Sequence, residues 1–269
     1  YRFFDWECPA FAHLPLILKP DGNGKLSKRD GDRLGFPVFP TEWTNPETNE
    51  VSSGYREEGY FPEAFTNMLA FLGWNPGTAQ EIFSMDELVE SFSLQRVGKA
   101  GAKFDFDKTK WFNQQYLRSK SGDELAELIH SKIPKSKDAD GVFLAKVCEL
   151  MKERATFVED IWESSQFFFD PPNEYDEKTH RKKWKEHTPD ILKKVTELFG
   201  GMSDFSAENV EKEFKSLLEE NEWGLGMVLP TFRLAVTGKG MGPSMFKISE
   251  LLGKDEVVER IETAIQKLS

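Results

Sequence analysis

The feature that most constrains the fold is the helical spacing of apolar residues from residue 122 to the end of the chain. Apolar side chains recur there every three or four positions, which is the period of one face of an α-helix. Turn-forming and capping residues interrupt the pattern at intervals typical of globular helices. This region is therefore predicted to be almost entirely α-helical.

Caps and breakers set the expected bounds of these helices. Asp123 is expected to cap a helix over 124–133, and a long amphipathic helix over about 142–167 is expected to end before Pro171-Pro172. A helix that begins after Pro189 is expected to close at Gly200-Gly201. The remaining helices are expected over 207–220, where Ser206 is the N-cap, and over about 243–252 and 254–268.

Residues 1–120 follow a less regular pattern. The apolar segment 11–18 leads into a turn and predicts a buried strand or core segment. Residues 34–53 are rich in Pro, Thr and Asn, which is typical of an inserted loop or hairpin, and we assign them no role. Helices are predicted over 62–73 and after Ser84, which forms a capping box with Glu87.

The charge of the chain is unevenly distributed. The net charge of −11 argues against a nucleic acid wrapped around the whole surface. However, residues 94–120 and 178–194 each carry seven lysines and arginines against two acids, whereas 204–222 show the reverse. The net charge therefore does not exclude a local basic face that binds nucleic acid.

Hydrophobic and aromatic contents of 39% and 13% exclude a disordered chain. No apolar run reaches the ~20 residues that span a bilayer, so no membrane association is expected. The two cysteines, Cys8 and Cys148, are too few for a disulfide framework or a four-cysteine zinc site. A reducing, cytoplasmic location is expected.

One short motif has a composition suited to phosphate chemistry. Residues 25–29 read K-L-S-K-R and follow Gly22-Asn23-Gly24. Glycine backbone approaches phosphate oxygens closely, and two lysines neutralise charge that develops in phosphoryl or nucleotidyl transfer. The spacing is not that of a P-loop. Taken alone, such a short basic loop is more often just a solvated turn.

The flanking sequence makes the motif specific. Residues 11–31 closely resemble the second signature of class I glutamyl-tRNA synthetases, whose K-M-S-K-S loop takes the form K-L-S-K-R. Residues 59–74, 92–97 and 104–108 resemble three further family elements, and 232–238 resembles part of the family's anticodon-binding region. Because these motifs occur in family order over essentially the whole chain, the sequence resembles a bacterial-type glutamyl-tRNA synthetase.

The family's first signature, H-I-G-H, does not occur in this sequence. The resemblance therefore implies the C-terminal part of the enzyme, with a mainly α fold. It implies the end of a Rossmann-type catalytic domain over 1–33, a stem-contact region over 34–120 and a helical anticodon-binding region over 121–269. We expect such a fragment to bind tRNA without catalysing the reaction alone.

The resemblance also implies a nucleotide site. In the family, ATP and glutamate form glutamyl-adenylate, and glutamate is then transferred to tRNA(Glu). Lys25 and Lys28 are implied to be catalytic and to carry charge to the phosphates, with Lys28 stabilising the transition state. Ser27 and Arg29 are implied to hold the loop and Trp6 to contact ATP, with core packing as the alternative for Trp6. The full enzyme would use ATP and Mg²⁺, whereas for this chain we expect a monomer with no bound cofactor and no metal site.

Two groups of residues are implied to contact tRNA. Backbone phosphates are expected to meet a basic group, although a solvated basic face is the alternative: Arg96, Lys99 and Lys103. Unstacked anticodon bases are implied to meet a second group, in which an arginine can bond or stack on a base: Arg233, Gly242, Pro243 and Met245. For Met245 the alternative is a buried helix residue.

Three alternatives remain open at this point. Residues 198–201 contain no arginine where some family members read the third anticodon base, so discrimination between glutamate and glutamine tRNAs stays open. A glutaminyl-tRNA synthetase is disfavoured by the helical pattern after residue 122, since that enzyme has β-barrel anticodon domains. The third alternative is a non-catalytic helical interaction module, in which the basic run at residues 25–29 has no functional role.

Overall fold

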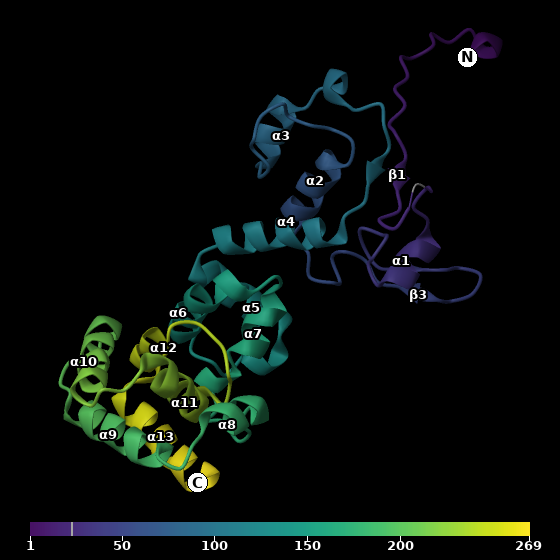
Figure 1. Ribbon diagram of the computed structural model, residues 1–269. Helices are drawn as coiled ribbons and strands as arrows, with labels where there is room; N and C mark the ends of the chain where they lie inside the picture. Colours follow the sequence, from purple (N-terminus) through teal and green to yellow (C-terminus); the bar gives the residue numbers. More distant parts are fainter. Residues whose placement is uncertain (23) are drawn as a thin grey trace. The chain divides into compact units, whose positions relative to one another are not determined.

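The computed structural model describes residues 1–22 and 24–269, without the side chain of Asp32. It is mainly helical, with two small sheets among the described residues (Figure 1). The chain divides into two units. The N-terminal unit comprises Tyr1–Lys120 and Ala155–Val158, and the C-terminal unit comprises Ser121–Arg154 and Glu159–Ser269.

The N-terminal unit combines short strands with four helices. Its elements, in chain order, are η1 (Arg2–Phe4), β1 (Ile17–Leu18), α1 (Lys28–Leu34), β2 (Trp43–Thr44), β3 (Val51–Ser52), α2 (Pro62–Phe71), α3 (Met85–Ser91), η2 (Leu94–Arg96), β4 (Ala102–Lys103) and α4 (Phe106–Ser119). The predicted capping box of α3 is confirmed, because Ser84 and Glu87 exchange hydrogen bonds from backbone to side chain.

The prediction of a buried strand over 11–18 is wrong for most of that segment. Only Ile17–Leu18 form a strand, parallel to β4, with Ile17 opposite Ala102 and Leu18 opposite Lys103. Phe11 and Leu14 are 68% and 67% exposed. The strand is short because, among the described residues, β4 satisfies the backbone of this segment only near its end.

Residues 34–53 include a hairpin, one of the two forms expected. Strands β2 and β3 pair antiparallel, with Trp43 opposite Ser52 and Thr44 opposite Val51. Asn45 stabilises the turn, since its side-chain oxygen accepts the backbone N–H of Glu47 at 2.9 Å.

The core of the N-terminal unit is aromatic. Phe36, Tyr60, Phe104 and Phe112 are buried together, and Phe36 lies 4.7 Å from Phe104 between ring centroids. Phe112 is 1% exposed, so its ring is a core side chain rather than a surface on which a base could stack. This core includes side chains from β1, α1, α2 and α4.

The C-terminal unit is built of helices and 3₁₀ turns in its described structure (Figure 1). Its elements are α5 (Gly122–Lys132), η3 (Pro134–Ser136), α6 (Gly141–Met151), η4 (Lys152–Arg154), α7 (Val158–Ser164), η5 (Gln166–Phe168), α8 (Glu177–Lys183), α9 (Thr188–Gly201), α10 (Ala207–Glu220), α11 (Leu225–Thr237), α12 (Met245–Leu252) and α13 (Lys254–Leu268). Phe199, Phe214, Phe232 and Phe246 from α9–α12 pack in its core.

The N-terminal end of α5 differs from the prediction. Ser121, not Asp123, is the N-cap, because its hydroxyl accepts the N–H of Glu124 at 3.2 Å while Glu124 accepts the N–H of Ser121 at 2.7 Å. This reciprocal pair satisfies two N–H groups that a helix end leaves free. Ser206, by contrast, is the N-cap of α10 as predicted.

The predicted long helix over 142–167 is in fact broken. Helix α6 ends at Met151, and residues 155–158 belong to the N-terminal unit. There the carbonyl of Thr156 accepts the Asn113 amide at 2.7 Å, and Phe157 packs edge-on against Tyr60. The apolar pattern was misleading because these residues are buried in a different core from that of α6.

The two glycines after Phe199 do not close α9 as predicted. The helix continues through Gly200 and Gly201, and Met202 is its C-cap. Neither glycine has the positive φ that usually makes glycine terminate a helix, whereas Gly238, the C-cap of α11, has φ 69°.

Within the described residues, no helix combines the length and apolar character required to cross a membrane.

Candidate functional sites

The K-L-S-K-R segment leaves a tight backbone turn and enters α1. The N–H of Lys19 donates to Gly24 at 2.9 Å, and the N–H of Leu26 donates to Ile17 at 2.8 Å. Lys25 is exposed and pairs with Leu18 through an isolated bridge. Asn23, the middle residue of the predicted glycine loop, lies outside the described residues. Because Ile17 and Leu18 are also paired with β4, the stem of this turn is tied to residues 102–103.

A buried carboxylate holds the start of α1. Asp30 accepts the N–H of Ser27 at 3.0 Å and the Ser27 hydroxyl at 2.5 Å, and it lies 2.9 Å from the Lys19 ammonium. These hydrogen bonds, that from the Ser27 side chain first, hold the pKa of Asp30 well below its usual range. Ser27 and Lys19 are thereby connected through one charged group. Asp30 is not among the predicted site residues, although its position as the third helical residue after Ser27 was a usable signal.

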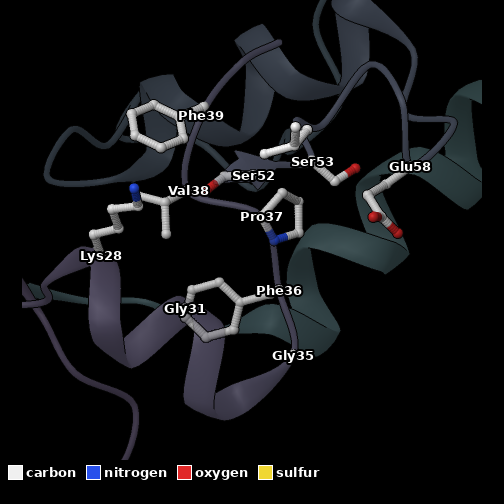
Figure 2. Close-up of a pocket in the computed structure, with 11 residues that line it drawn as sticks. Lys28, Gly31, Gly35, Phe36, Pro37, Val38, Phe39, Ser52, Ser53 and Glu58 are labelled. Carbon is white, nitrogen blue, oxygen red and sulfur yellow. The ribbon is translucent and has the colours of Figure 1, made fainter. Parts of the chain in front are cut away.

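Lys28, the first residue of α1, is directed toward the hairpin. Its Nζ lies 4.1 Å from the ring centroid of Trp43 and 5.3 Å from that of Phe39. Figure 2 shows Lys28 extending from the start of the helix toward Phe39 and Val38, at a cavity of about 310 Å³. The two aromatic residues were missed because nothing local in the sequence pairs residue 28 with residues 39 and 43.

The other two residues of the predicted nucleotide site are exposed. Arg29 points to solvent from the first turn of α1. Trp6 is 64% exposed and stacks on Phe4 with 5.1 Å between ring centroids. The alternative of core packing for Trp6 is therefore wrong in this structure, since its ring contacts other exposed aromatic residues instead of a core.

The structure brings three of the four predicted anticodon residues together. One terminal nitrogen of Arg233, Nη2, donates to the carbonyl of Pro243 at 2.7 Å. Its other terminal nitrogen, Nη1, is buried and has no hydrogen-bond partner among the described residues. A Cβ placed on Gly242 would lie 2.7 Å from that nitrogen, so a side chain at this position would displace the guanidinium. Burial, with the nearby charge of Arg154, lowers the pKa of Arg233.

A cavity of about 590 Å³ opens beside this group. Residues 239–243 line it, and so do Arg154, Asp160 and Phe167. The exposed Met241 lies in the loop that joins α11 to α12. In the structure this loop is a connection between two helices.

Met245, the fourth predicted anticodon residue, does not lie with Arg233, Gly242 and Pro243. It is the first residue of α12 and is 1% exposed, so its side chain is part of the helical core. The structure therefore favours the alternative of a buried helix residue.

The predicted phosphate-contacting group is exposed on the N-terminal unit. Arg96 ends η2, where it approaches Gly77, Lys99 follows in the loop, and Lys103 lies in β4. All three are available to solvent, an arrangement that fits both the tRNA contact and the solvated face. Among the described residues, no group of three or more His, Cys, Asp or Glu side chains is placed to hold a metal ion.

Comparisons with known proteins place both sites in context. The anticodon binding domain family matches residues 124–265, and the catalytic domain family of class I tRNA synthetases (E and Q) matches residues 1–111. Together these matches include the K-L-S-K-R segment and the Arg233 cavity.

Two relatives that match the whole chain are both glutamate–tRNA ligases. The chain is 52% identical to a glutamate–tRNA ligase of Phocaeicola vulgatus and 47% identical to one of Christiangramia forsetii, and it covers 54% and 53% of these proteins. A crystal structure of a glutamate tRNA ligase from Elizabethkingia meningosepticum, in complex with its amino acid, superposes with a TM-score of 0.92 at 44% identity. All of the present chain and 54% of that one are covered. The chain thus spans about half the length of the curated relatives it matches.

Proposed function

The chain belongs to the glutamate–tRNA ligase family of class I synthetases, and from this premise we propose that it forms the tRNA-binding part of a ligase that joins glutamate to tRNA(Glu). The observation that carries the proposal is the pair of sites just described. One is a K-L-S-K-R segment ordered by Asp30, and the other is a half-buried arginine, with one nitrogen unpaired among the described residues, that contacts Pro243 at the edge of a cavity of about 590 Å³. We propose a cytoplasmic location for this function.

The proposed chemistry runs in two steps. A glutamate carboxylate oxygen attacks the α-phosphate of ATP, a P–O bond forms, and pyrophosphate leaves with the electron pair of the bond that breaks. The terminal ribose hydroxyl of tRNA then attacks the activated carbonyl, loses its proton, and displaces AMP. Lys25 and Lys28 are proposed to supply positive charge to the leaving phosphates in the first step.

The chain's own residues are proposed to order that charge. Asp30 anchors Ser27 at the start of α1, and this fixes the backbone position from which Lys28 extends. Lys25 is exposed on the preceding turn. No metal cluster fits the described residues, so we assign Mg²⁺ to the nucleotide substrate and route no step through a metal ligand of this chain.

The Arg233 cavity is proposed to receive an unstacked anticodon base. A guanidinium with one N–H group already bonded to Pro243 has a fixed orientation, and we propose that its buried Nη1, which has no partner among the described residues, becomes a donor to a base edge when RNA binds. Arg96, Lys99 and Lys103 are proposed to contact backbone phosphates, which position the RNA without reading its sequence.

Binding of transcribed tRNAs to the purified chain tests the proposal. We expect preferential binding of tRNA(Glu), with weaker binding after the anticodon is changed. A preference for tRNA(Gln) would contradict the proposed specificity for tRNA(Glu). No tRNA binding even at low salt would contradict the proposal and favour an interaction module.

A further inference from the structure

The ammonium of Lys28 lies against two aromatic rings. Trp43 and Phe39 stack on each other with 5.1 Å between centroids and 27° between planes, and Lys28 Nζ lies within 5.3 Å of both. An ammonium within about 6 Å of a ring centroid is attracted by the negative face of the ring. Both rings belong to residues 36–55, which we term the aromatic hairpin.

The aromatic hairpin is firmly attached to the N-terminal unit. The N–H of Tyr55 donates to the carbonyl of Phe39 at 2.9 Å, and Phe36 packs at 4.7 Å against Phe104 in the core. At the base of the hairpin, a Cβ on Gly54 would overlap the backbone of Thr41, so the two sides approach as closely as glycine permits. The rings are thus presented by a fixed element.

Helix α1 packs directly on this hairpin. A Cβ on Gly31 would overlap the Val38 side chain and lie 2.9 Å from the carbonyl of Phe36. Gly31 is one turn beyond Lys28, and both residues border the cavity between the helix and the hairpin. The contact between Lys28 and the rings is therefore set by the packing of two elements.

An aromatic partner and a carboxylate partner have different effects on the charge of an ammonium group. A ring attracts the ammonium without cancelling its charge, and this attraction at exposed sites corresponds to about a two- to fivefold preference. A polyphosphate, with several negative charges, attracts the same ammonium more strongly. Among the side chains that the structure describes, Lys28 has no carboxylate partner, so its charge is retained for such a ligand.

We propose that Phe39 and Trp43 are positioning residues for Lys28. Without ligand they hold its ammonium against the aromatic hairpin, and a bound polyphosphate draws it away. The second half of this proposal rests on the proposed role of residues 25–29 in nucleotide binding.

Lysine acetylation followed by mass spectrometry tests the resting contact on the purified chain. The amine of Lys28 must leave the rings before it reacts with an N-hydroxysuccinimide acetate. We expect Trp43→Leu to raise the acetylation rate of Lys28 about two- to fivefold, whereas Trp43→Phe, which keeps an aromatic face, leaves it near the wild-type rate. Lys25 serves as the internal reference.

Equal Lys28 rates in the wild type and in a folded Trp43→Leu variant would overturn the contact. Phe39→Leu provides a second variant, with a smaller increase expected, should Trp43→Leu fail to fold. Unfolding curves of each variant separate loss of the contact from loss of the fold.

Calorimetric titration with inorganic pyrophosphate tests whether a bound polyphosphate draws the Lys28 ammonium away from the rings. Because the rings compete with the ligand, Trp43→Leu is expected to bind pyrophosphate about two- to fivefold more tightly than the wild type, and Trp43→Phe about as the wild type does. Weaker pyrophosphate binding by Trp43→Leu than by the wild type would overturn the proposal that the rings compete with a polyphosphate for Lys28. If no variant binds pyrophosphate, the proposed role of the loop fails, while the acetylation rates still decide whether the rings hold Lys28.

Discussion

At the residue scale, one carboxylate organises the K-L-S-K-R segment. Asp30 accepts two hydrogen bonds from Ser27 and pairs with Lys19, and it lies 3.6 Å from the Arg33 guanidinium. A carboxylate with several donors is stabilised in its charged form, which is why its pKa is depressed. The proposed catalytic loop therefore depends on a residue that is not itself proposed to touch ATP.

Asp30→Asn is expected to lower the free energy of unfolding at neutral pH. Since the folded-state pKa of Asp30 is depressed, its stabilising contribution is complete above the unfolded value of about 3.8 and is lost as the pH falls through the folded value. The difference in free energy of unfolding between wild type and variant should therefore become smaller in the acid range. Urea unfolding at a series of pH values measures this difference, and Asp107→Asn in α4 is the control. A difference in unfolding free energy that stays constant with pH would contradict the stabilising role of the Asp30 carboxylate.

Arg233 combines a proposed role in anticodon recognition with a local structural contact, its hydrogen bond to the Pro243 carbonyl. Arg233→Ala is expected to weaken tRNA(Glu) binding by about 1–3 kcal/mol, because the base loses a donor at a desolvated site. Arg233→Lys retains the charge but not the planar fork, so it should recover little of the loss. Filter binding measures both variants. Unchanged affinity alongside an unchanged melting curve would refute the anticodon role.

At the element scale, the ends of helices depend on backbone angles and close contacts rather than on residue type alone. Gly200 lies inside α9, and a Cβ placed on it would have no neighbouring atom within 4 Å. Gly238 has φ 69°, and a Cβ placed there would lie 2.8 Å from the Pro172 side chain. The same residue type therefore has opposite roles in α9 and α11.

Gly200→Ala should stabilise the chain by up to about 1 kcal/mol, since alanine loses less backbone entropy in a helix. Gly238→Ala should destabilise it by about 1–3 kcal/mol, because a side chain there is strained and crowded. Thermal or urea unfolding of the matched pair checks this. Destabilisation by Gly200→Ala would indicate that α9 ends before Gly200.

At the scale of the whole molecule, net charge is a poor guide to partners. The chain carries −11, yet the exposed cations of the N-terminal unit include Arg96, Lys99 and Lys103. RNA affinity depends on local phosphate contacts and on the counterions they release, so a basic face within an acidic protein is sufficient.

Alanine at each of Arg96, Lys99 and Lys103 should weaken tRNA binding at every sequence and reduce the slope of log affinity against log salt by about 0.7–0.9. Lys215→Ala is the matched control, because Lys215 pairs with Glu211 on the acidic helix α10 and should leave the slope unchanged. Salt titrations of tRNA binding measure these slopes. If the three variants keep the wild-type slope, the cations form only a solvated face.

The sequence by itself determined the features that depend on neighbouring residues. The helical period after residue 122, the cap of α10, the capping box of Ser84 and Glu87, and the family motifs all follow from short-range spacing. These are local because a helix turn and its cap involve residues within four positions of one another.

Only the tertiary structure decided which residues meet across the chain. It buried residues 155–158 in the N-terminal unit, placed Met245 in a core, left Phe11 exposed and set Lys28 against Trp43. Each of these outcomes depends on packing between segments far apart in sequence, and periodicity records that a residue is apolar but not which core it enters.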